Sequence, residues 1–143
     1  MLGDERVVDA VVDEMTGRKG RFVDVAVLLL RRHHDGAVRL LEGDPAPVPP
    51  SVATSPKLLL GNSHPAHQSA LLDSMASVEL AVADTMGLWI DVARPDLESL
   101  LTRVHGVVMN EEEATSFTGA PSLVDAAKKL LDCGPNFAVV KKG

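Results

Sequence analysis

After residue 56 the sequence alternates between short apolar runs and amphipathic stretches, and this alternation constrains the fold more than any other feature. The apolar runs are typical of strands, and they are Lys57–Leu60, Val78–Ala83, Gly106–Met109 and Phe137–Val140. The stretches between them predict helices that begin near Pro65, Pro95, Glu111 and Ser122. Strands that alternate with helices form crossover units, so the sequence predicts an α/β fold with a mostly parallel sheet. Because the runs are apolar throughout, we expect burial on both faces of the sheet.

A proline-rich stretch precedes this region and divides the chain. Residues 45–56 contain five prolines, which fix φ and remove backbone donors, so the sequence predicts a linker there. Residues 1–44 form a different segment. In it, apolar residues at helical spacing from Val7 to Met15 predict a helix, and Val23–Leu30 and Ala37–Leu41 predict strands with a turn at Asp35-Gly36. We therefore expect an N-terminal segment (1–44), a linker (45–56) and an α/β domain (57–143).

Composition excludes several classes of function. The chain has 143 residues, which suits one domain, and its formal net charge of -6 disfavours nucleic acid and anionic membrane surfaces as partners. No apolar run is long enough to span a membrane, and the N-terminus lacks the order of a signal peptide. One cysteine, Cys133, fits a reducing compartment. We therefore expect a cytoplasmic protein.

Three polar residues follow predicted strands, and they are the first candidates for a site. Asn62, Asp84 and Asn110 lie where ligands bind in open parallel sheets, at the carboxyl ends of strands. Asn110 and Glu113 have the spacing of a capping box, in which each residue caps the start of the next helix. The same helix start can bind a phosphate, and its carboxylates can hold Mg²⁺ through water. The spacing alone leaves both interpretations open.

Other candidates favour a structural role. His64 and His67 have a spacing seen in metal sites, but no third ligand is evident, so a solvated or capping histidine is expected. Cys133 is expected to be a buried structural thiol, and Trp89 and Ile90 are expected in the core. No glycine-rich dinucleotide motif, Walker-type loop or Gly-x-Ser-x-Gly elbow is present.

The region from Lys57 to Gly143 resembles the ribokinase-like (PfkB) carbohydrate kinases. The matching segments have the order and separation of that family's middle section, and they are Leu59-Leu60-Gly61-Asn62-Ser63-His64-Pro65, Val82-Ala83-Asp84-Thr85-Met86-Gly87-Leu88-Trp89-Ile90, Val108-Met109-Asn110-Glu111-Glu112-Glu113-Ala114, Thr118-Gly119 and Val139-Val140-Lys141-Lys142-Gly143. Each segment is weakly specific alone, and together they are fairly specific.

The resemblance implies a three-layer ribokinase-like sandwich, incomplete on its C-terminal side. It implies transfer of the γ-phosphoryl group of ATP, with Mg²⁺, to a hydroxyl of a sugar or nucleoside. The family's Asn-x-x-Glu motif falls on Asn110 and Glu113, so the resemblance implies that this pair positions magnesium and phosphates, Glu113 reaching the metal through water. It implies a supporting role for Asp84, and it makes Lys141, Lys142 and Gly143 the entry to the nucleotide loop.

The departures from the family pattern limit these expectations. The Gly-x-Gly-Asp motif, whose Asp is the family's general base, would follow Gly143, so the resemblance implies no catalytic base within these residues. The family's early glycine-rich sugar-binding region is not found in residues 1–55. Two hypotheses follow: a partial sugar kinase, or a non-catalytic α/β module that binds nucleotide or a protein partner. A sheet that lacks its last strands would expose an edge and an apolar face, so homo-oligomers are expected.

Overall fold

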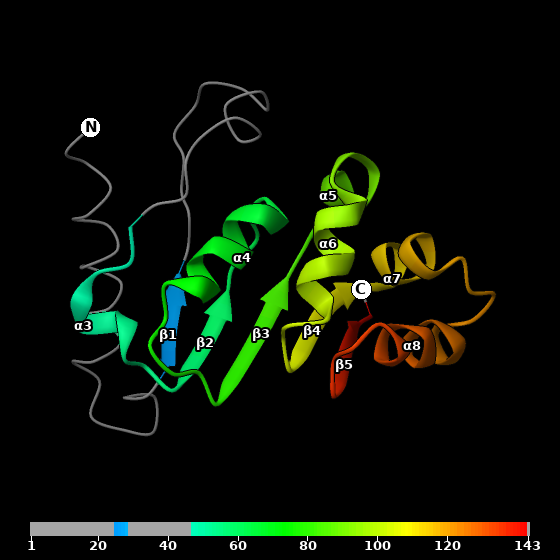
Figure 1. The fold of residues 1–143 in the computed structure, drawn as a ribbon. Coiled ribbons are helices and arrows are strands. Elements are labelled where there is room, and N and C mark those ends of the chain that lie inside the picture. The colour runs from blue at the N-terminus through cyan, green and yellow to red at the C-terminus, as the bar shows by residue number, and fades with distance from the viewer. Residues whose placement is uncertain (1–24, 29–46, 143) are drawn as a thin grey trace.

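One parallel sheet organises the molecule. The computed structural model describes residues 25–28 and 47–142. Within these ranges five strands are joined in the order β1-β2-β3-β4-β5, and every neighbouring pair is parallel. The strands, shown in Figure 1, are β1 (Val25–Leu28), β2 (Lys57–Leu60), β3 (Leu80–Asp84), β4 (Gly106–Asn110) and β5 (Phe137–Lys141). The predicted α/β fold with a parallel sheet is confirmed.

The helices that connect the strands form a continuous layer. They are α3 (Pro50–Ala53), α4 (Pro65–Asp73), α5 (Gly87–Val92), α6 (Arg94–Leu101), α7 (Glu111–Thr118) and α8 (Leu123–Asp132). In that layer α4 packs on α6, α5 packs on α6 and α7, and α7 packs on α8. Each crossover moves to the next strand in the same direction, so right-handed connections place these helices on one face of the sheet. Figure 1 shows α4 and α6 in front of the strands.

The core lies between this helix layer and the sheet. In β2 and β3 alternate residues are buried and the residues between them are half-buried. The runs are apolar throughout and the described helices cover one face, so the expectation of burial on both faces stays a prediction for these strands. The buried residues of the strands pack with those of the helices, and the largest of them are Leu58, Leu60, Trp89, Leu97, Leu100, Leu101, Met109 and Leu130.

The opposite face of the sheet is apolar and partly exposed near β5. Phe137 and Val139 point to this face and are 39% and 46% exposed. Gly106 is the register partner of Phe137. A Cβ atom built on Gly106 would lie 2.2 Å from the Phe137 ring, so the ring covers the glycine backbone. The ring shields a position of β4 that has no side chain to protect it.

Local sequence signals account for the helix ends. Proline occupies the first turn of α4 and α6, where its missing N–H is not needed. Ser122 caps α8 by accepting a hydrogen bond from the Asp125 N–H. Gly119 ends α7 in the left-handed conformation, with φ of 61°, which glycine adopts without steric cost.

The structure differs from the sequence expectations in several places. The predicted linker contains the one-turn helix α3, because Pro50 sits at its first position and tolerates the missing donor. Helix α5 was not predicted, since six residues give too short a pattern.

Part of the N-terminal prediction can be compared with the structure. The predicted strand Val23–Leu30 is confirmed over β1, which pairs with β2 in the same sheet. The predicted helix from Val7 to Met15, the strand Ala37–Leu41 and the turn at Asp35-Gly36 lie outside the described residues. The division into three segments stays a prediction. No helix in the described ranges is long and apolar enough to cross a membrane.

Candidate functional site

The carboxyl edge of the sheet collects the polar residues that the sequence singles out. Asp84 is the last residue of β3 and Asn110 is the last residue of β4. Asn110 is the register partner of Lys141, the last residue of β5. Asn62 follows β2 by two residues. The parallel sheet thus places Asp84, Asn110 and Lys141 on three adjacent strands at one edge, as the sequence predicts for its strand ends.

Asp84 and Lys141 form an ion pair across this edge. Lys141 Nζ lies 4.0 Å from Asp84 Oδ1, and the two side chains are 55% and 35% exposed. The same carboxylate oxygen accepts a hydrogen bond from the Thr85 N–H, at 3.0 Å. Surface pairs of this kind add little stability, because water screens them and the lysine side chain loses freedom. The pair therefore places a carboxylate and an ammonium side by side where a solute can reach both.

Asn110 and Glu113 form a closed capping box at the start of α7. The Asn110 Oδ1 atom accepts a hydrogen bond from the Glu113 N–H, at 2.8 Å. In return, Glu113 Oε2 accepts one from the Asn110 N–H, also at 2.8 Å. The capping interpretation is confirmed. The second oxygen, Oε1 of Glu113, makes no hydrogen bond to any residue that the structure describes, so it is free to accept one from a ligand or a metal-bound water.

The loops after β2 and β3 are joined by a buried glutamine that the sequence analysis missed. The Gln68 amide nitrogen donates to the carbonyl oxygens of Gly61, at 2.9 Å, and Asp84, at 2.8 Å, and more weakly to Leu60, at 3.3 Å. The side chain is fully buried. One signal was available: Gln68 precedes Leu71 by three positions, which puts a polar residue on the apolar face of α4.

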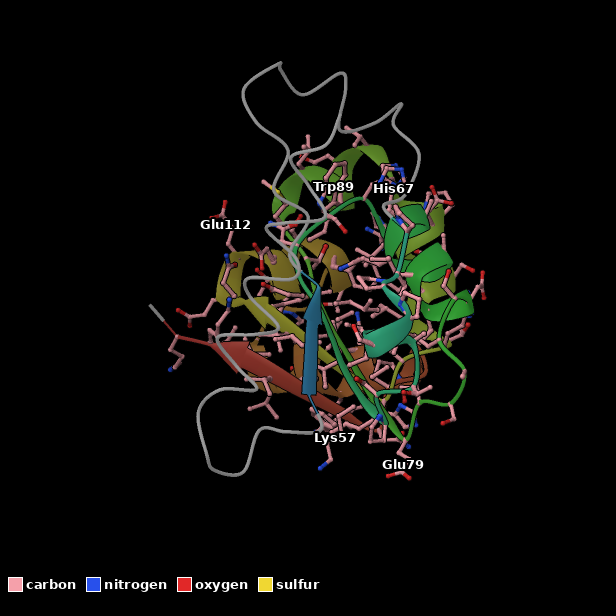
Figure 2. The ribbon with its side chains drawn as sticks, turned by 90° about the vertical axis from the view of Figure 1, so that its left-hand side faces the viewer. Lys57, His67, Glu79, Trp89 and Glu112 are labelled. Atoms are coloured by element: carbon pink, nitrogen blue, oxygen red, sulfur yellow. The ribbon has the colours of Figure 1, made fainter. Side chains whose placement is uncertain are left out.

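A second link joins the same two loops. Trp89 Nε1 of α5 donates to Asn62 Oδ1, at 2.9 Å, and the Trp89 side chain is buried as expected. The His64 ring meets Trp89 edge-on, with 5.1 Å between ring centroids. His64 Nδ1 caps α4 by accepting from the Ala66 N–H, which confirms a capping role for this histidine. Figure 2 shows Trp89 and His67 at the end of the molecule opposite to Lys57 and Glu79.

Oxygen ligands for a metal are present at this edge, although the described residues by themselves form no complete set of metal ligands. Among residues 25–28 and 47–142 no group of three or more His, Cys, Asp or Glu side chains could hold a metal ion. Mg²⁺ commonly uses one or two carboxylates together with waters and substrate phosphates. The Asp84 and Glu113 carboxylates are donors of that type. Lys142 is exposed beyond β5, and Gly143 lies outside the described residues.

A separate cavity of about 370 Å³ lies between α6, α7 and α8. Two cations at its wall bind carbonyls at the end of α7: Arg94 donates to Phe117, at 2.6 Å, and Lys129 donates to Thr118, at 3.2 Å. Cys133 lines the same cavity and is partly buried against the core, so the expectation of a buried thiol is met only in part. Partial burial and the nearby Glu98 and Asp132 carboxylates raise the pKa of the Cys133 thiol above its ordinary value. The two cations cap the end of α7, and the raised pKa of Cys133 disfavours its thiolate form.

Comparison of the sequence with protein-family models finds no match, and comparison with curated proteins finds none. The kinase interpretation therefore depends on the motif segments and on the geometry of the carboxyl edge.

Proposed function

We propose that this chain is part of a PfkB-type carbohydrate kinase and that its carboxyl edge binds the phosphates and magnesium of ATP. The reaction would transfer the γ-phosphoryl group of ATP to a hydroxyl of a sugar or nucleoside. The observation that carries the proposal is the meeting of Asp84, the Asn110–Glu113 box and Lys141 on adjacent strand ends. These are the positions that the motif segments assign to phosphate handling.

Charge at this edge suits a magnesium–triphosphate group. Phosphoryl transfer gains mainly from positioning and from neutralising negative charge, and it asks for little covalent chemistry from the protein. Lys141 supplies an ammonium that is already held near its carboxylate partner, Asp84. When bound, Mg²⁺ supplies charge neutralisation between phosphate oxygens. The carboxylates of Asp84 and Glu113 are the residues that would hold it, the latter through water.

The capping box gives Glu113 a fixed position for this role. The Asn110 N–H holds one carboxylate oxygen, which orients the other oxygen without occupying it. Groups that orient a metal-bound water in this way are second-layer ligands, and their loss typically weakens metal affinity or activity by about 10- to 100-fold. Capping and phosphate handling are compatible, because the hydrogen bonds that start α7 also position the carboxylate.

The proposal includes a ribokinase-like three-layer fold, with further elements on the face opposite to α4 and α6. The apolar side chains on that face, Phe137 and Val139, support this part, because large apolar groups are usually covered. We also propose a cytoplasmic protein, since one cysteine and an acidic net charge fit a reducing compartment.

Replacing Glu113 separates capping from magnesium binding. The variant Glu113→Gln keeps an oxygen that can accept from the Asn110 N–H, so the stability of α7 should change by less than about 0.5 kcal/mol. The lost negative charge should raise the dissociation constant of MgATP about tenfold. Calorimetric titration of the chain with MgATP, beside urea denaturation, measures both quantities.

The matched control is Glu112→Gln, which removes the same charge from an exposed neighbour outside the box. It should leave MgATP affinity within about twofold, because a screened surface charge contributes little. If the two variants weaken MgATP binding equally, the loss of affinity comes from the change in overall charge, and the proposed magnesium-binding role of Glu113 is wrong. If the unmodified chain does not bind MgATP at all, the nucleotide proposal fails, and the non-catalytic interpretation with a protein partner takes its place.

A further inference from the structure

One ion pair joins two strands of the carboxyl edge that are not neighbours in the sheet. Lys141 ends β5 and Asp84 ends β3, and β4 lies between the two strands in Figure 1. The register aligns Asp84 with Val108 of β4, and it aligns Lys141 with Asn110 of β4. Because aligned residues share a face and Val108 and Asn110 are two positions apart, both side chains of the ion pair lie on the same face of the sheet. The Lys141 side chain therefore reaches Asp84 across the end of β4.

The two members of this pair are held very differently. The Asp84 carboxylate also accepts a hydrogen bond from the Thr85 N–H, and the Asp84 carbonyl accepts one from the buried Gln68 amide. The Lys141 ammonium makes no other hydrogen bond or ion pair with the residues that the structure describes, and its side chain is 55% exposed. A lysine ammonium sits on a flexible four-carbon stem. A ligand therefore meets a fixed carboxylate and an ammonium that can move.

A second carboxylate at the edge is also fixed. Glu113 Oε2 accepts a hydrogen bond from the N–H of Asn110, which is the register partner of Lys141. The edge therefore combines two fixed carboxylates with one ammonium. Free Mg²⁺ at Asp84 would lie beside this ammonium, and like charges repel. Phosphate oxygens, in contrast, attract the ammonium and give it a partner other than Asp84.

We propose that Lys141 makes the carboxyl edge selective for Mg²⁺ that arrives with nucleotide phosphates over free Mg²⁺. The inference rests on the proposed function of this edge. When the magnesium–nucleotide complex binds, the Lys141 ammonium leaves Asp84 for the phosphate oxygens, and the Asp84 carboxylate becomes available to hold the metal. Each charge then has an opposite partner, which free Mg²⁺ alone does not provide. Lys141 is therefore a specificity-determining residue of the edge.

A purely structural role for the ion pair predicts a different result. Exposed ion pairs contribute little to stability, because water screens them and ordering a lysine side chain costs entropy. A pair that only held the edge together would affect unfolding, and its loss would not strengthen the binding of any ligand. Selectivity instead requires that loss of the ammonium changes the affinities for free Mg²⁺ and for MgATP in opposite directions.

Lys141→Met tests the inference, because methionine keeps an unbranched stem and removes the ammonium. The interaction of unit charges about 4 Å apart in water corresponds to about a fivefold change in an equilibrium constant. The dissociation constant of free Mg²⁺ should therefore fall about fivefold, because the ammonium no longer competes for Asp84. The dissociation constant of MgATP should rise about fivefold, because the phosphates lose their cation. The Thr85 amide, which donates to Asp84 Oδ1, follows both titrations by NMR.

Two further variants separate the position of the charge from its amount. Lys141→Arg keeps a cation at the position, so it should bind free Mg²⁺ within about twofold of the unmodified chain. Lys128→Met removes the same charge from an exposed position of α8, and it should leave both affinities within about twofold. Urea denaturation should give the same midpoint for Lys141→Met and the unmodified chain, since the pair is exposed.

The outcomes distinguish this inference from the proposed function. If the unmodified chain binds MgATP but Lys141→Met does not bind free Mg²⁺ more tightly, the selectivity is wrong and the nucleotide site stands. Equal changes in Lys141→Met and Lys128→Met would also overturn the inference, because overall charge would then explain them. An unmodified chain that does not bind MgATP would overturn both the proposed function and the inference.

Discussion

Backbone conformation at single glycines shows where the fold has no tolerance for a side chain. Gly134, which follows the end of α8, has φ of 134°, and a Cβ atom there would lie 2.8 Å from the Leu101 carbonyl oxygen and from Thr102 Cα. Both contacts are with the backbone, which cannot move aside as a flexible side chain would. The residue therefore holds the turn between α8 and β5 against the end of α6.

We expect Gly134→Ala to lower the free energy of unfolding by about 2 to 4 kcal/mol, from backbone strain and the close contact together. Gly87→Ala is the matched control. A Cβ atom at Gly87 meets nothing within 4 Å. At this first position of α5 alanine should be neutral or stabilise by up to about 1 kcal/mol. Urea denaturation measures the free energy of unfolding of both variants. If Gly134→Ala and Gly87→Ala were equally stable, the turn at Gly134 would be able to relax around a side chain.

At the scale of elements, α4 does more than cover the sheet, because Gln68 ties the ends of β2 and β3 together. Its amide nitrogen donates to the carbonyl groups of Gly61 and Asp84, one in each loop. The Gln68 Oε1 and Thr85 Oγ1 atoms are buried and have no hydrogen-bond partner in the same part of the chain. Gln68 therefore holds the two loops beside Asp84 together with the Trp89–Asn62 hydrogen bond.

Replacing this side chain should loosen both loops. Gln68→Leu removes the amide that donates to the Gly61 and Asp84 carbonyls at a fully buried position, which should cost about 2 to 4 kcal/mol of stability. Ser69→Ala, on the same helix, makes no comparable change and should stay within about 0.5 kcal/mol of the unmodified chain. Hydrogen exchange should show faster exchange of the Thr85 amide in Gln68→Leu. Unchanged stability together with unchanged exchange would mean that the loops are held by other contacts.

A comparison of the helices and strands with the sequence shows which elements sequence patterns can predict. The four strands after residue 56 and the helices α4, α6, α7 and α8 were predicted from apolar periodicity and capping signals, and the Asn110–Glu113 box was predicted from spacing. Helix α5 and the one-turn α3 were not, because short helices depend on tertiary packing rather than on their own pattern. Gln68 was missed because its position on the apolar face of α4 was the one signal, and its backbone carbonyl partners cannot be identified from the sequence.

For the whole molecule, sequence predicted the presence of a parallel sheet but not how it is covered. Uniformly apolar strands suggested two buried faces, whereas the described helices cover one. Strand order made the difference, because a sheet whose strands follow in sequence receives all its crossover helices on the same side. The positions of the candidate residues were predicted better than the layers, since strand ends at Asp84 and Asn110 meet at one edge in any parallel sheet.

Backbone-amide NMR during a titration of the chain with MgATP tests whether the carboxyl edge binds the phosphates of the nucleotide. We expect shifts at Thr85, at Asn110–Glu113 and at Lys141, which share this edge. Lys57 and Glu79, at the other end of the molecule in Figure 2, should stay unchanged. Magnesium chloride alone should reproduce little of the pattern. No shifts at saturating MgATP, or shifts confined to the region of Lys57 and Glu79, would show that the carboxyl edge does not bind the phosphates.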